Sequence, residues 1–407
     1  TEFGVFVTVN EGAGWVQIKG GLPTIQIRDM DIHRTENDLV LGTFGRGFYV
    51  LDDYTPLRQI TEQALEQEAI LFPVRDAKRY IEKTSRIGSR GHDFYTADNP
   101  PFGATFTYYL KDGFESLTDQ RIEVEKEAME GDEEVAIPSF DELRTEDEEL
   151  DPAMVFTIRD TAGDVVRRVD GCAKKGIHRV TWDLRYPSAK PTDISGKKPS
   201  RWGMPSIGPL VVPGTYSVSM AKKIDGVMTE IAGPVSFEVV DLALAALPGA
   251  PPAEALAFEL QVAELQRAVG GAVKVTKEID DRLAHLRQAI LDTPDANADH
   301  LAKARAFQAE LDDIEIALVG DPSKSERNVF TPPSVNDRVN RIVSGLWTTT
   351  QGPTNTQRDN YAWAGEAFTT ELGRLDALVT ELETFEAELE TAGAPWTPGR
   401  VPTWQPE

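Results

Sequence analysis

The stretch that decides the fold reads IHRVTWDLR over residues 177–185 and, after a loop, GTYSVSMA over residues 214–221. In both segments side chains suited to a core alternate with polar ones, which is the pattern of a strand with one buried face. The expected inward set is His178, Val180, Trp182, Leu184, Tyr216, Val218 and Met220. Short strands separated by glycine turns precede this stretch, and long helical patterns follow it. The sequence therefore predicts a multidomain chain, mainly β and then α, with these strands at the centre of a β-sandwich.

Length and charge bound the possible functions. A chain of 407 residues predicts two to four domains of roughly 100–200 residues each. Its 67 acidic and 42 basic residues give a formal net charge of −25, which repels phosphate backbones and anionic membrane surfaces. Nucleic-acid binding is therefore disfavoured. The acidity itself fits a saline habitat, a cation-rich partner or a need for solubility.

Cysteine usage and apolar runs add two further limits. Cys172 is the only cysteine, so neither an intrachain disulfide nor a cysteine-based metal cluster is possible. No apolar run reaches the ~20 residues that a membrane helix needs. The chain opens at Thr1 and enters a strand pattern at once over residues 4–9, so we expect the natural N-terminus, with any export signal, to lie upstream.

A turn motif in the first 53 residues carries a family resemblance. Thr8, Asn10, Gly12 and Trp15 stand at the spacing of a turn between two strands. This motif resembles the Asp-box of sialidase-like and sortilin-type β-propellers, although Asn10 stands where the family usually has Asp. Asn keeps the hydrogen bond that makes the turn but loses the charge. We expect these four residues to be structural, because the motif names a turn and not a reacting geometry.

A second segment, LGTFGRGFYVLDD over residues 41–53, is similar to the closing blade of a bacterial group labelled glycosyl hydrolase, BNR repeat or sortilin-like protein. The resemblance implies a secreted or periplasmic bacterial protein. Residues 1–53 hold five predicted strands, about one and a half blades, whereas a propeller has ~4–8 blades of four strands. We therefore expect a terminal blade remnant, completed by upstream blades or by a partner chain.

A predicted connector (54–102) leads to a predicted sandwich (103–240). Residues 182–187 (WDLRYP) and 213–218 (PGTYSV) resemble an immunoglobulin-like or fibronectin-like module that follows propellers in the same bacterial group. The acidic run 121–150 lacks the spacing of a calcium-binding loop, so we expect a solvated insertion.

The period becomes helical beyond the sandwich. Over residues 251–392 we predict an antiparallel bundle of four helices, at about 253–291, 298–319, 334–347 and from 356 onward, because each has one apolar stripe. A kink is expected in the first helix at Gly270 and Gly271. A proline-rich tail, 393–407, follows the bundle.

Catalytic motifs are missing from the sequence. There is no Gly-x-Ser-x-Gly elbow, His-Glu-x-x-His helix, phosphate loop or dinucleotide fingerprint, and we expect no cofactor and no metal. Candidate ligand-binding residues are Asp52, Asp53, Arg90 and Trp202; the loop Trp202 either stacks on a sugar ring or packs on one end of the sandwich.

Three hypotheses remain open. The first is a non-catalytic scaffold that braces a propeller or binds a glycan or protein partner. The second is part of a glycoside hydrolase whose active site lies mainly on other blades. The third is a protein–protein assembly module built on exposed strand edges. An apolar, uncovered blade edge would favour assembly, whereas a deep cleft with two facing carboxylates would favour the enzyme.

Overall fold

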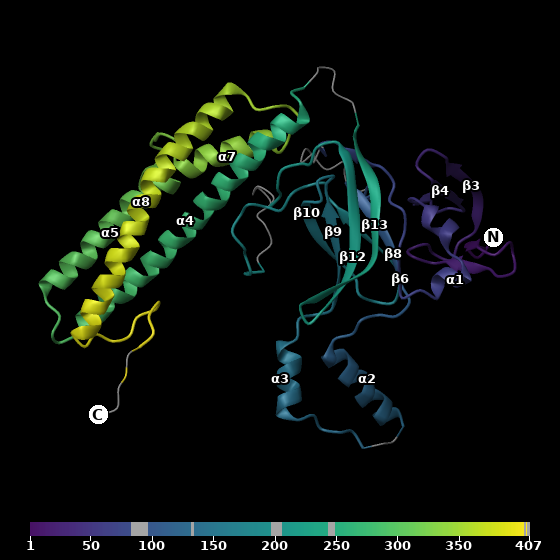
Figure 1. Ribbon diagram of the computed structural model, residues 1–407, viewed down its shortest axis with the longest axis horizontal. Helices are drawn as coiled ribbons and strands as arrows, with labels where there is room; N and C mark the ends of the chain where they lie inside the picture. The colour runs from purple at the N-terminus through teal and green to yellow at the C-terminus, as the bar shows by residue number, and fades with distance from the viewer. Residues whose placement is uncertain (83–96, 132–133, 197–205, 243–248, 403, 405–407) are drawn as a thin grey trace. The chain divides into compact units, whose positions relative to one another are not determined.

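The computed structural model describes residues 1–82, 97–131, 134–196, 206–242, 249–402 and 404 (Figure 1). The chain forms two compact units. The first comprises residues 1–185 and 213–244 and holds every strand of the described residues, with three α-helices and one 3-10 helix between them. The second comprises residues 186–212 and 245–407 and holds the long helices. A multidomain chain that combines β-rich and α-rich parts is therefore what the sequence encodes.

The first 53 residues form two small antiparallel sheets, and all five strands predicted here are present. The strands are β1 (Val5–Val7), β2 (Val16–Ile18), β3 (Ile27–His33), β4 (Asp38–Thr43) and β5 (Phe48–Leu51). β1 pairs with β2, and β3, β4 and β5 form a meander in sequence order. Gly45 and Gly47 adopt positive φ in the β4–β5 turn, a conformation in which glycine is unstrained.

Two further sheets, one of five strands and one of three, contain the remaining described strands of the first unit. A five-stranded sheet has the order β10-β9-β12-β13-β7, and a three-stranded sheet has the order β11-β8-β6. All neighbours are antiparallel except β13 and β7. The bounds are β6 Ala69–Leu71, β7 Ala77–Arg79, β8 Ala104–Leu110, β9 Ala153–Arg159, β10 Val165–Gly171, β11 Gly176–Trp182, β12 Gly214–Ile224 and β13 Val227–Asp241. A short 3-10 helix, η1 (Thr55–Gln59), and α1 (Glu62–Leu65) precede them.

The two sheets share one aromatic core. Phe106 of β8 stacks on Phe156 of β9 with ring centroids 5.9 Å apart, and Trp182 of β11 meets Tyr216 of β12 edge-on at 5.6 Å. Trp182 is fully buried and its indole nitrogen donates to the Arg185 carbonyl. The alternating stretch that opened the sequence analysis thus supplies one strand to each sheet, with the large side chains between them.

The acidic run predicted as an insertion is solvated, but it is helical. Between β8 and β9 the chain forms α2 (Leu117–Glu130) and α3 (Phe140–Glu148), and neither helix contains a buried residue. Ser116 caps α2, and Ser139 with Glu142 forms a capping box on α3. These caps satisfy backbone donors that the first turn of a helix leaves free.

Four long helices of the second unit bury one continuous apolar core. They are α4 (Pro252–Asp292), α5 (Ala298–Val319), α7 (Val335–Leu346) and α8 (Asn355–Thr391), with the short α6 (Pro322–Ser325) between α5 and α7. α4 is a continuous helix through Gly270 and Gly271, where the sequence predicts a kink or weak point. A Cβ at Gly270 would lie 2.9 Å from Pro191 Cδ, so the glycine admits a closely packed loop.

Candidate functional site

Asp52 and Asp53 lie directly after β5 and have different surroundings. The backbone N–H of Asp53 donates to Asp38 Oδ1 at 2.9 Å. Asp53 Oδ1 accepts from the Thr55 backbone N–H at 3.1 Å and from the Thr55 hydroxyl, and Arg179 of β11 donates to the Asp53 carbonyl at 2.7 Å. Asp53 itself has φ of 42°. Its carboxylate is therefore engaged in shaping the turn that leaves the small sheet.

The surroundings of Asp52 shift the pKa of its carboxyl. Partial burial raises the pKa of Asp52, the nearby Asp38 carboxylate raises it further, and the Arg179 and Arg75 guanidinium groups oppose both effects. Arg75 also lies 3.5 Å from Glu36 Oε2 and 3.7 Å from Asp38 Oδ1. The carboxylates of the β3–β4 turn, of the start of β4 and of the end of β5 thus meet guanidinium groups supplied by the connector and by β11.

An open hollow lies beside Asp52. Its lining includes Arg46, Phe48, Tyr49, Asp52, Asp98 and Pro100. The Phe48 ring is 81% exposed. The exposed Phe48 ring can stack on a flat apolar face of a ligand, while the carboxylates and the guanidinium beside it can form hydrogen bonds with the polar edge of that ligand. The described lining residues include no His, Cys, Ser or Lys, so they offer no nucleophile paired with a base.

The other predicted site residues fall in two groups. Arg90 and Trp202 lie outside the described residues. In the Asp-box-like turn, Gly12 N–H donates to Thr8 Oγ1 at 2.9 Å and Gly14 N–H donates to Asn10 Oδ1 at 2.8 Å, while Trp15 is exposed. The side chains of Thr8 and Asn10 thus replace the backbone acceptors that a tight turn lacks.

The meander of β3, β4 and β5 carries apolar side chains on both faces. Met30, Leu41 and Tyr49 are directly paired across the three strands and share one face. The alternate positions Val40 and Val50 pair on the opposite face, where Phe48 also lies because it is two residues from Val50.

Exposure differs sharply along this small sheet. Leu41 is only 4% exposed, whereas Met30 on the same face is 58% exposed. On the opposite face Phe48 and Val50 are both exposed. Catalytic residue types carry no information about apolar side chains exposed on both faces of a sheet. The run Leu39-Val40-Leu41 does carry it, because consecutive apolar residues in a strand point to opposite faces.

The described residues were also considered for metal sites and for membrane-spanning helices. Within the ranges given above, no group of three or more His, Cys, Asp or Glu side chains is arranged to hold a metal ion. No helix in the described part of the chain has the length and apolar character needed to cross a bilayer.

Comparison of the chain with protein-family models, with curated proteins and with solved structures finds no match.

Proposed function

We propose that this chain is a non-catalytic scaffold in which β1–β5 form part of a β-propeller, completed by further blades of the same polypeptide or of a partner chain. The observation that carries the proposal is the meander β3-β4-β5, which exposes large apolar side chains on both faces. Antiparallel sheets with one solvated face alternate apolar and polar residues. A blade inside a propeller is different, because a neighbouring blade covers each of its faces.

Energetics support covering of both faces. Met30 and Ile32 on one face, and Phe48 and Val50 on the other, are all exposed. Fully burying one such side chain stabilises a protein by about 1.5–3 kcal/mol, so two neighbouring sheets would gain from contact with this one. The proposed occupant is accordingly another antiparallel sheet with an apolar face. The Asp-box-like turn between β1 and β2 agrees with that occupant at the level of fold resemblance only.

In the same proposal the rest of the chain positions the blade. The two sheets that share the Phe106 core would act as an immunoglobulin-like sandwich, and the helices of the second unit as an antiparallel bundle. Arg179 of β11 holds the carbonyl of Asp53, and Arg75 contacts the β3–β4 turn. These contacts fix the small sheet to the larger ones, which is the role expected of a brace.

Footprinting with a carbene reagent tests the proposal. The purified 407-residue chain is compared with the assembly isolated under native conditions from the organism that makes it. Met30, Ile32, Phe48 and Val50 should be labelled in the chain and protected in the assembly, while the exposed helix residues Ile316 and Leu372 serve as an internal reference. Equal labelling of the four strand residues in both samples would end the propeller proposal.

The glycoside hydrolase alternative retains one favouring observation, the hollow that places Phe48 and Tyr49 beside Asp52 and Asp98. If this hollow takes a sugar, Phe48 must stay uncovered in the assembly. A polysaccharide screen that records both binding and release of reducing ends, with Phe48→Ala and Asp52→Asn as variants, separates the two. Loss of glycan binding in both variants would favour the sugar site over the blade contact.

A further inference from the structure

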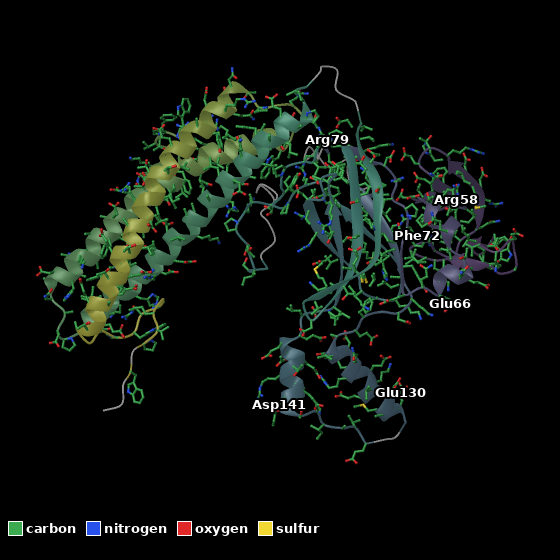
Figure 2. All side chains as sticks on the ribbon, in the orientation of Figure 1. Arg58, Glu66, Phe72, Arg79, Glu130 and Asp141 are labelled. Atoms are coloured by element: carbon green, nitrogen blue, oxygen red, sulfur yellow. The ribbon has the colours of Figure 1, made fainter. Side chains whose placement is uncertain are left out.

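The helical insertion α2–α3 concentrates charge and exposes apolar side chains together. Residues 115–151 contain sixteen Asp and Glu residues and three Lys and Arg residues, a net formal charge of −13 out of −25 for the whole chain. Figure 2 shows Glu130 and Asp141 on the two helices of this segment. More than half of the net charge therefore lies in about a tenth of the sequence.

The two helices are held to each other by polar contacts at one end. Arg121 Nε donates to Glu146 Oε1 at 2.8 Å and Arg121 Nη1 donates to Glu125 Oε1 at 2.7 Å. Glu149 Oε2 accepts the backbone N–H of Leu117 at 2.7 Å. Since neither helix has a buried residue, this pair lacks the apolar packing that normally stabilises short helices in a protein.

Apolar side chains nevertheless recur along the insertion. Val124 is 65% exposed and Phe140 is 82% exposed. The further exposed members are Leu117, Ile122, Met129, Ile137 and Leu150. A purely solvating segment does not need residues of this size. Leu117 and Val124 are seven residues apart and lie on one side of α2, whereas Ile122 and Met129 lie on another. Exposed apolar side chains repeated within one segment are the feature from which an interaction surface is inferred.

We propose that α2–α3 is a docking surface for a basic polypeptide whose bound segment combines Lys or Arg with apolar side chains. The exposed apolar residues supply the contact area, and the surrounding carboxylates select the charge of the partner and speed its encounter. An amphipathic segment of opposite charge meets both requirements at once.

Charge argues against the other occupants. A second copy of this chain would bring its own −25 toward the most acidic segment and be repelled. Nucleic acids and anionic membranes carry the same sign of charge as the insertion. The docking surface is separate from the sheet β3-β4-β5, so it stands whether or not the propeller proposal holds.

The test measures binding of a defined probe to the full chain. The probe is a 14-residue peptide of Leu and Lys in amphipathic helical order, and the matched peptide has Gln at every Leu position. The variant of the chain carries Ile122→Gln, Val124→Gln, Met129→Gln and Phe140→Gln, which keeps its charge. The control variant carries Leu291→Gln, Ile316→Gln, Val319→Gln and Leu372→Gln on exposed helix positions of the other unit.

The expected result has three parts. The Leu–Lys peptide binds at least tenfold more tightly than the Gln–Lys peptide, the insertion variant loses at least tenfold in affinity, and the control variant is unchanged. Bound peptide should also slow amide exchange within residues 117–130 and 140–148. Both variants should fold, because the replaced side chains are exposed. Circular dichroism of each variant checks this.

Three outcomes would overturn the proposal. Equal binding of the two peptides would mean that charge alone attracts them. Full affinity in the insertion variant would place the contact elsewhere. Dimerisation through α2–α3 in light scattering, or binding of the chain to neutral phosphatidylcholine vesicles that the insertion variant abolishes, would assign the surface to a second copy or to a lipid surface instead.

Discussion

Replacing Phe48 by Thr should barely affect the isolated chain. Thr keeps the strand preference of the position, so the change mainly removes apolar contact. Full burial of a Phe side chain is worth about 1.5–3 kcal/mol. Phe48 is 81% exposed, so only about a fifth of this free energy is realised in the isolated chain. The substitution should therefore cost roughly 0.3–0.6 kcal/mol. In an assembly where a neighbouring blade covers the ring, the same change should cost about 3–5 kcal/mol, as truncation of a packed aromatic does.

Amide exchange of β4 and β5 measures the local free energy of opening. Leu41→Ala is the matched control, because Leu41 is 4% exposed on the same sheet and its truncation should cost about 2–5 kcal/mol in either context. If Phe48→Thr lowers the opening free energy of the isolated chain as much as Leu41→Ala does, the ring is already covered there. No neighbouring blade would then be missing from this face of the sheet.

Three further predictions concern charged groups. The side chain of Glu386 is 2% exposed, and the Arg282 guanidinium donates to its two carboxylate oxygens at 3.0 and 2.8 Å. Arg282→Met should lower the free energy of unfolding of the helical unit, measured with denaturant, by about 3 kcal/mol. Adding Glu386→Leu should restore most of that free energy. The Arg121 hydrogen bond lowers the pKa of Glu146, so the contribution of this pair is complete above the ordinary Glu pKa of about 4.3 and is lost as the pH falls through the lower, folded value. The protection of the α2 amides, measured relative to exchange of the unfolded chain at the same pH, should fall in that acid range. Unchanged protection would contradict a stabilising role of the pair. Burial raises the pKa of Asp52, so its ionisation disfavours the folded state above that pKa; Asp52→Asn should raise the thermal midpoint at pH 7, and the gain should vanish below the ordinary Asp pKa of about 3.9.

The long helices were accessible to sequence reasoning. The α5 bounds Ala298–Val319 match the predicted range. The helix predicted from residue 334 begins at Val335, after a capping box formed by Ser334 and Asp337. An apolar repeat sustained over twenty or more residues identifies a helix even where single residues break the repeat. Capping residues then indicate where the helix begins and ends. The strands of the alternating stretch were accessible for the same reason, because successive side chains in β11 and β12 differ in exposure.

The helical insertion and the hollow were not accessible in the same way. The acidic run has no single apolar stripe from which a helix could be predicted. Its two helices are marked in the sequence only by the N-cap residues Ser116 and Ser139. The hollow joins Phe48 of β5 with Asp98 and Pro100, about fifty residues later in the chain. Such a meeting depends on how the connector returns to the small sheet, and no local pattern records it.

The order of segments in the two units has a consequence for modular exchange. The chain leaves the first unit after residue 185, returns at residue 213 and leaves again after residue 244. A gene fusion that transfers residues 245–407 alone would omit Pro191, whose ring lies against Gly270 of α4. Recombination at a single boundary therefore cannot move the helical unit intact, so the strands and helices are expected to be inherited as one piece.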